Sequence, residues 1–326
     1  MTPSTLAGTI RAAEVGRFPA PGGVDSGRHG AQNGAMNEVA ARDDAVLPAT
    51  RVAAVVVVAV LVPALIILWG LPTRTEDLWA WTIAAPLTPI FMGAGYGAGA
   101  YFFARVYRAQ RWHEVSVGVI SAAVFALLML ITTVLHYDKF NQGKAHDGLP
   151  DPPALATIAF WGWTIVYILS PFIVGWLWWR NQQRDPREPE AGDAIVPPAV
   201  RVAARVVAVG ALAAGLLVLV SPSIAVENWG WTLTPLTARV LACFTAQVGT
   251  GFLLLSLDPR WSSWRVLVQT FLIAVGLLVV GAIRQWDTFG DDGVMQWGYV
   301  GGLACGAIAL LALYRRMQSP ATARPA

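Results

Sequence analysis

Apolar residues occur along this chain in eight long stretches, separated by short polar or basic segments. Each stretch is close to the roughly 20 residues that a helix needs to cross the hydrocarbon core of a bilayer. The pattern predicts transmembrane helices at about 51–71, 80–106, 115–137, 155–179, 202–220, 232–257, 265–286 and 296–314. The predicted fold class is therefore all-α, a polytopic membrane protein with eight transmembrane helices.

The second half of the chain repeats the pattern of the first. The matching strings are Trp79-Ala80-Trp81-Thr82 with Trp229-Gly230-Trp231-Thr232, Pro86-Leu87-Thr88 with Pro235-Leu236-Thr237, and Tyr137-Asp138-Lys139-Phe140 with Trp286-Asp287-Thr288-Phe289. From Pro86 to Phe140 the copies align at a constant offset of 149. Four spans return the chain to the side that it left, so we expect two parallel four-helix repeats, related by a pseudo-two-fold axis along the membrane normal.

The repeats set the expected domain organisation. The first repeat is predicted at 49–182 and the second at 201–318, joined by a polar linker at 183–200. Residues 1–48 have no periodic apolar face and are predicted to form a disordered tail, and 319–326 form a short C-terminal tail.

Composition agrees with the membrane class. Hydrophobic residues make up 56% of the chain and charged residues 13%, against about 25% charged in typical soluble proteins. The net charge of +3 does not indicate a nucleic-acid partner, because the basic residues lie at the ends of apolar stretches. They gather on one side, at Arg51, Arg105, Arg108, Arg111, Arg180, Arg201, Arg205, Arg260, Arg265, Arg315 and Arg316. By the positive-inside rule, both termini are expected in the cytoplasm and the protein in a bacterial plasma membrane.

Arg239 is the one ionisable side chain that the pattern places well inside a span. It follows Thr232 by seven residues, roughly 10 Å along a helix, and the first repeat has Ile90 at the matching position. Charges at such depth are costly, so they are usually paired or line a wet cavity. Arg239 therefore either binds a polar or anionic solute, or its side chain extends to the outer interface.

Four further residues are candidates for the same site. Asp138 and Asp287 close equivalent spans, where a carboxylate faces the negative end of the helix dipole; each either has a partner or is solvated. Thr88 and Thr237 follow Pro86 and Pro235. A proline inside a helix would free a carbonyl for a water or cation, whereas a proline in the first turn is an ordinary helix start. The predicted ligand-binding set is Arg239, Asp138, Asp287, Thr237 and Thr88.

A membrane enzyme is the third interpretation, because the sequence shows no nucleophile–base pair or metal constellation, and no cofactor is expected. His136 and His146, with Asp147 and Asp151 nearby, lack a ligand spacing typical of a metal site. There is no pair of inward-facing histidines for haem and no motif for a serine nucleophile or a bound phosphate. The two cysteines, Cys243 and Cys305, fall in apolar spans and are expected to be buried. Gly93, Gly95, Gly97 and Gly99 are expected to allow close helix packing.

Three strings resemble multispanning membrane proteins of high-GC actinobacteria. They are Glu227–Trp231 continued by Leu236-Thr237-Ala238-Arg239, then His136–Phe140, and Arg180-Asn181-Gln182 before Asp185-Pro186. The resemblance covers roughly residues 50–318. It implies the same topology and no activity, because this is an uncharacterised integral membrane protein family, and it adds weight to Arg239.

These observations favour a small-solute permease or channel-like protein with its site in the extracytoplasmic half. The alternative is a non-catalytic membrane scaffold or partner subunit, in which Arg239 has a structural role. The expected partners are membrane lipids, a small polar or anionic solute and a membrane protein.

Overall fold

Eight long helices make up most of the computed structural model, which describes residues 44–141, 153–186, 192–289 and 293–319. They are α2 (Pro48–Leu65, continued by the π-helical turn η1, Ile66–Gly70), α4 (Leu87–Arg108), α5 (His113–Leu135), α6 (Ala154–Gln182), α7 (Pro198–Val220), α9 (Pro235–Leu257), α10 (Trp261–Arg284) and α11 (Val294–Met317). Between them lie α3 (Thr75–Leu78), α8 (Ser223–Asn228) and the 3₁₀ turns η2 (Tyr137–Lys139) and η3 (Trp286–Thr288). The described residues contain no β-strand, so the all-α class is confirmed.

Seven of these helices are long and apolar enough to cross a membrane: α2 with η1, α5, α6, α7, α9, α10 and α11. Their composition is that of a multi-pass membrane protein. α4 corresponds to the second predicted span, at 80–106, but it is not one of these seven. Its 22 residues include four glycines and three tyrosines, which dilute the apolar side chains.

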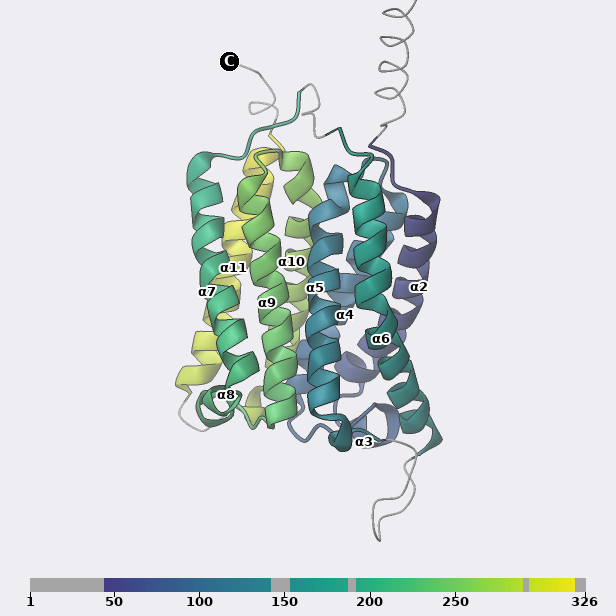
Figure 1. Cartoon of the computed structure of the whole chain (residues 1–326). Coiled ribbons are helices and arrows are strands. Elements are labelled where there is room, and N and C mark those ends of the chain that lie inside the picture. The colour runs from purple at the N-terminus through teal and green to yellow at the C-terminus, as the bar shows by residue number, and fades with distance from the viewer. Residues whose placement is uncertain (1–43, 142–152, 187–191, 290–292, 320–326) are drawn as a thin grey trace, which may run out of the picture. The chain divides into compact units, whose positions relative to one another are not determined.

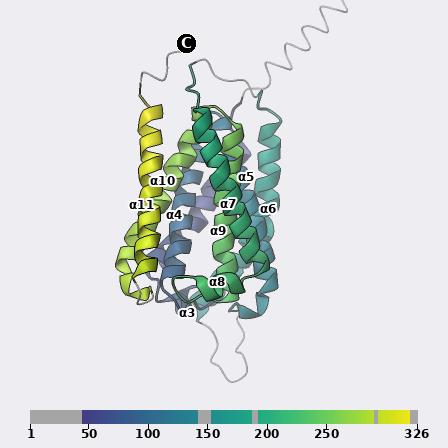
Figure 2. The ribbon, with the colours of Figure 1, turned by 90° about the vertical axis from the view of Figure 1, so that its left-hand side faces the viewer.

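Four of the long helices form the inside of the bundle and four flank it, as their contacts show (Figures 1 and 2). The inner helices are α4, α5, α9 and α10; α2 and α6 cover one flank, and α7 and α11 the other. Burial agrees with this arrangement. In the most apolar 18-residue stretch of each helix, half or more of the residues are buried in α5 and α9, and none are buried in α11.

The order of elements is the same in both halves of the chain: a long helix, a short helix, two long helices, a 3₁₀ turn and a last long helix. The contacts between helices match too. Within the halves, α2 packs on α4 and α7 packs on α9; between the halves, α4 packs on α10 and α9 packs on α5. We call the end of the bundle at which α2, α5, α7 and α10 begin the basic end, because most arginines lie there.

The repeated Pro-Leu-Thr strings mark helix starts. Pro235 is the first residue of α9, Thr234 is its N-cap, and Thr234 and Thr237 form a reciprocal capping box. Pro86 immediately precedes α4. Neither proline therefore interrupts a helix, and the interpretation as an ordinary helix start is confirmed, with α4 and α9 beginning later than predicted.

Two expectations from the sequence differ from the structure. Cys243 is buried, but Cys305 is exposed, because α11 packs against the bundle through one side only. Asp44 and Val46 fall in the range predicted as a tail, yet both are buried against the loop between α4 and α5. Residues 1–43, nearly all of the C-terminal tail and the outer loop at 142–152 lie outside the described residues.

Candidate functional site

Arg239 lies near the start of α9 and its bonds are to neutral acceptors. Its Nε donates to the carbonyl oxygen of Leu219 at 2.9 Å, and its Nη1 lies 2.7 Å from Nε2 of His136. Leu219 belongs to the last turn of α7 and His136 directly follows α5. The guanidinium therefore joins three helices at the end of the bundle opposite the basic end.

The two predicted carboxylates do not join Arg239. Asp138 is 67% exposed and pairs with Lys139 at 2.7 Å, and the Lys139 ammonium holds the pKa of Asp138 below its usual value. Asp287 is exposed on η3. The hydrogen bonds described for Arg239 include neither carboxylate.

The two predicted threonines are buried, and each has a structural partner. Thr88 accepts a hydrogen bond from the indole nitrogen of Trp231 at 2.9 Å, which joins α4 to the second half. Thr237 completes the capping box at the start of α9. Among the hydrogen bonds and ion pairs of the described residues, none joins two of the five predicted residues.

Three further arginines donate to helix ends, as Arg239 does, within the described residues. Arg51 binds the carbonyls of Tyr107 and Ala109 at the end of α4, at 2.6 and 2.7 Å. Arg205 binds Ser256 in the last turn of α9, and Arg284 binds the carbonyl of Trp69 in η1 at 2.9 Å. The last four carbonyls of a helix lack partners within it, and a cation there also complements the helix dipole. The contact of the Arg239 guanidinium with the end of α7 is therefore interpreted as structural.

His136 gives this contact a pH dependence. Burial, and then the charge of Arg239, lower the pKa of its imidazole. The unfolded chain therefore binds a proton at His136 more readily than the folded chain does. We expect the contribution of His136 to the free energy of unfolding to be complete above about pH 6.5. It should fall as the pH drops from there through the pKa of His136 in the folded state. Thermal unfolding of the wild type and of His136→Gln in detergent, across this pH range, measures the contribution. The same dependence of the thermal midpoint on pH in both proteins contradicts the expectation.

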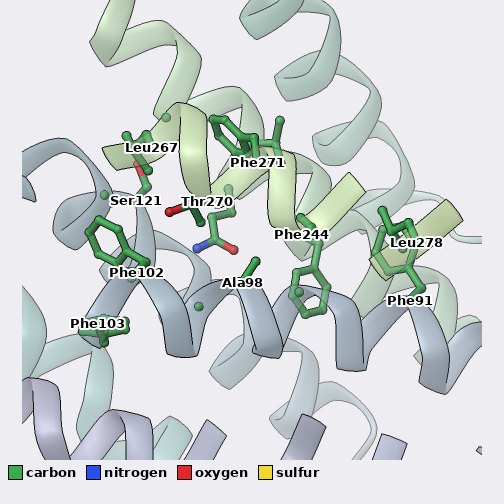
Figure 3. A pocket seen from close by; sticks show the side chains of 18 residues that line it. Phe91, Ala98, Phe102, Phe103, Ser121, Phe244, Leu267, Thr270, Phe271 and Leu278 are labelled. Atoms are coloured by element: carbon green, nitrogen blue, oxygen red, sulfur yellow. The ribbon is translucent and has the colours of Figure 1, made fainter. Parts of the chain in front are cut away.

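A cavity of about 140 Å³ lies between the four inner helices (Figure 3). Its lining is Phe91, Gly95, Ala98, Gly99, Phe102 and Phe103 from α4, Gly118, Ser121 and Ala122 from α5, Phe244, Gln247, Val248 and Gly251 from α9, and Leu267, Thr270, Phe271, Ala274 and Leu278 from α10. The cavity thus lies where the two halves of the chain meet. Its volume is close to that of an engineered cavity, about 150 Å³, that admits benzene.

Three polar side chains face an otherwise apolar lining. Ser121 and Thr270 stand at equivalent positions of α5 and α10, and each hydroxyl donates to the carbonyl four residues before it, at 2.8 and 2.9 Å. Their oxygens remain able to accept. Gln247 has no hydrogen-bond partner among the described residues, so its amide is available to a guest in the cavity. No residue of the lining carries a charge.

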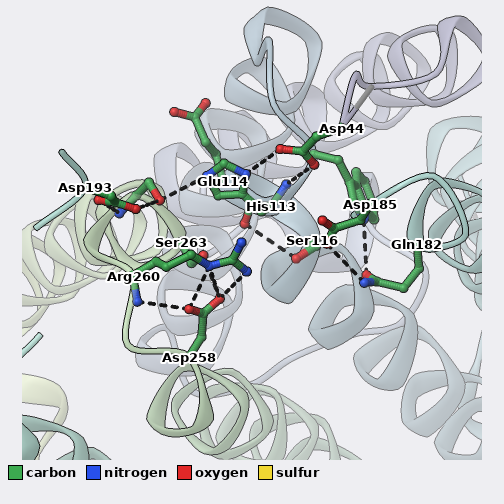
Figure 4. A network of polar contacts seen from close by, with 12 residues as sticks. Asp44, His113, Glu114, Ser116, Gln182, Asp185, Asp193, Asp258, Arg260 and Ser263 are labelled. Atoms are coloured by element: carbon green, nitrogen blue, oxygen red, sulfur yellow. Dashed lines mark hydrogen bonds and ion pairs between the residues drawn. The ribbon is translucent and has the colours of Figure 1, made fainter. Parts of the chain in front are cut away.

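A second polar cluster lies at the basic end (Figure 4). Nδ1 of His113 is 2.5 Å from the Asp44 carboxylate, and its Nε2 is 3.0 Å from the hydroxyl of Ser262. That hydroxyl donates to the Asp193 carboxylate in a short hydrogen bond. His113 and Asp44 are 2% and 6–8% exposed, so the imidazole and its carboxylate are fully inside the protein. His113 begins α5 and Ser262 lies in the first turn of α10, so the line crosses between the two halves.

A carboxylate, an imidazole and a serine in a row also occur in hydrolases, where the histidine activates the serine. Here the Ser262 hydroxyl is engaged on both sides, by His113 and by Asp193. A nucleophile needs its oxygen free to approach a substrate. The geometry therefore favours a connection between helices over catalysis.

Neighbouring charges around this line are paired. Arg260 binds Asp258 at 2.8 Å and Arg265 binds Glu114 at 2.7 Å. Burial alone would raise the pKa of the Asp258 carboxyl, but hydrogen bonds from Arg260 and Ser263 hold it below its ordinary value. The pKa of Arg260 is raised, first by its bond to Asp258.

The sequence carries a signal for this cluster. Arg111-Trp112-His113 and Arg260-Trp261-Ser262 match at the same offset of 149 as the longer repeat, and so do Asp44 and Asp193. Each aspartate precedes a long helix by a few residues and lies in a segment predicted as tail or linker. Repeated polar positions outside the spans therefore predict contacts between the two halves.

Comparison with protein families, with curated proteins and with solved structures gave no match. Within the described residues, no group of three His, Cys, Asp or Glu side chains lies close enough together to hold a metal ion. His146, Asp147 and Asp151 lie outside those residues.

Proposed function

We propose that the protein is a small-solute permease or channel-like protein of the bacterial plasma membrane, and that its solute occupies the cavity between α4, α5, α9 and α10. The observation that carries this proposal is the cavity's position between the two halves of the chain. Transporters built from repeats hold their substrates near the middle of the membrane, where the repeats meet.

The cavity chemistry favours a small uncharged solute. The lining offers one free amide, from Gln247, and two hydroxyl oxygens among phenyl and aliphatic groups. An anion would find no cation there. The proposal thus moves the site from the Arg239 end to the centre of the bundle, and it replaces the anionic solute with a neutral one.

The repeat architecture belongs to the same proposal. The two halves are taken as parallel four-helix repeats with α4 as the eighth span, and the order of elements and the exchanged contacts support this. The basic end faces the cytoplasm, as the positive-inside rule favours. The strings that resemble actinobacterial multispanning proteins support membership in that uncharacterised family.

Filling the cavity is expected to reduce solute flux strongly. Ala98→Leu places a larger side chain into the lining, and we expect at least a tenfold loss of flux of small neutral solutes such as urea and glycerol, corresponding to about 1.4 kcal/mol. Light scattering of proteoliposomes after an osmotic step measures the flux. Ala214→Leu, on the exposed face of α7, is the matched control. Equal flux in both variants, with both correctly folded, argues against the cavity as the path.

The alternative is a membrane scaffold or partner subunit, and α11 favours it. No residue in the most apolar 18-residue stretch of α11 is buried. Gly298, Gly302 and Gly306 have open space where a Cβ would lie. Such a spacing of glycines allows another helix to approach closely. A stable complex with a second membrane protein, together with no flux in proteoliposomes, would favour this function.

A further inference from the structure

The hydrogen-bonded line Asp44–His113–Ser262–Asp193 joins the two halves at the basic end (Figure 4). We propose that this line is a proton-binding site. It holds one proton more than a neutral histidine and a serine hydroxyl supply together. That proton completes the hydrogen bond between α5 and α10. This inference does not depend on the proposed transport function.

A count of hydrogens carries the argument. Three contacts in the line have hydrogen-bond length, and each needs one hydrogen. A serine hydroxyl supplies one hydrogen, a neutral imidazole supplies one, and an ionised carboxylate supplies none. Two hydrogens cannot make three bonds, so the complete line contains one further proton.

The backbone shows where this proton lies. The N–H of His113 donates to Asp44 Oδ1, and the N–H of Ser262 donates to Asp193 Oδ1, both at 3.2 Å. Hydrogen bonds from a helix N-terminus favour the ionised form of a carboxylate. Because imidazole is also a stronger base than carboxylate, the proton belongs on His113. An imidazolium then donates from Nδ1 to the Asp44 carboxylate and from Nε2 to the Ser262 hydroxyl, which itself donates to Asp193.

The charges around the imidazole support this assignment. On the segments before α2 and α7, Asp44 and Asp193 contribute two negative charges. From α5, α10 and the loop before α10 come Glu114 with Arg265 and Asp258 with Arg260, each an ion pair. Asp185, after α6, adds a negative charge near Arg260. Arg111, two residues before His113, is an exposed cation. The other cations named here are paired, and the carboxylates bonded to the line, Asp44 and Asp193, favour imidazolium.

Loss of the proton breaks a specific bond. A neutral His113 keeps a hydrogen on Nδ1 for the Asp44 carboxylate, and the Ser262 hydroxyl keeps its hydrogen for Asp193, because both are bonds to an ionised acceptor. A lone pair of Nε2 then faces a lone pair of the serine oxygen. The bond that fails is the one between the halves, so protonation stabilises their contact and rising pH weakens it.

Nitrogen-15 NMR of the full chain, labelled at histidine, tests the proposal. At about pH 8, where an ordinary histidine is neutral, we expect one imidazole with both ring nitrogens protonated, and its absence in His113→Gln identifies it. His136, whose pKa is lowered, serves as the neutral reference in the same spectrum. A His113 signal with a single protonated nitrogen at this pH overturns the proposal.

Stability supplies a second measurement, which does not need the His113 variant to fold. We expect the thermal midpoint of the wild type to fall with rising alkaline pH by about 2–4 °C more than that of Ser262→Ala. Ser263→Ala, which removes a hydroxyl bound to Asp258 instead, is the control and should keep the wild-type slope. Identical slopes in wild type and Ser262→Ala contradict a proton held between the halves.

Discussion

Replacing Arg239 by leucine is expected to destabilise the protein by about 2–4 kcal/mol, because two strong hydrogen bonds are lost and their acceptors are left without a donor. The Leu219 carbonyl lies in the last turn of α7 and cannot find a donor within its own helix. The imidazole of His136 loses its bond at the same time. Denaturation of the purified protein in detergent, followed by circular dichroism, measures the change.

The control for Arg239 is another arginine at the same end of the bundle. Arg74 pairs with Asp77 at 2.8 Å, and its side chain is 61% exposed. Arg74→Leu should change stability by no more than about 0.5–1 kcal/mol, since exposed ion pairs contribute little. If Arg239→Leu has full stability but loses solute flux, the structural assignment of Arg239 fails and a role in solute binding returns.

The helices were predictable because a bilayer imposes one strong requirement on sequence. Each span must be apolar over about 20 residues, and this pattern is visible without knowledge of the fold. The predicted ends of α5 and α7 lie within a few residues of the observed ones. α4 was the exception: the Trp79–Ala85 stretch is apolar enough to extend the predicted span, but Pro86 delays the helix start.

The candidate site was harder to predict, because a charged residue in a span has two explanations. The sequence shows that Arg239 is costly, but it cannot show which acceptor offsets the cost. That acceptor is a backbone carbonyl 20 residues away, and every helix end offers such carbonyls. The cavity is equally hidden, since it depends on how Ala98 and Gly95 of one half face Phe244 and Gln247 of the other.

The basic-end line was within reach of the sequence. His113 and Ser262 stand at matching positions of the sequence repeat, at the offset of 149 residues, and they are bonded to each other. The two repeats differ at this position, and the difference permits the bond. Two histidines would repel each other when protonated, whereas a histidine and a serine share one hydrogen bond.

Gly93→Ala is expected to cost about 1–3 kcal/mol, because a Cβ at this position of α4 would lie 2.7 Å from the backbone nitrogen of Trp69 and 2.8 Å from its Cβ. These atoms belong to η1, which Arg284 and the Trp69 indole hold against α10, so they cannot move aside cheaply. α4 and η1 must then separate.

Gly99→Ala, on the same helix, is the matched variant with the opposite expectation. Its Cβ would meet only the end of the Leu61 side chain, at 3.0 Å, and this methyl group can rotate away. Alanine also favours the helix over glycine by up to about 1 kcal/mol. Thermal midpoints of the two variants in one detergent should therefore move in opposite directions, and a similar loss in both would show that α4 tolerates no added volume along its length.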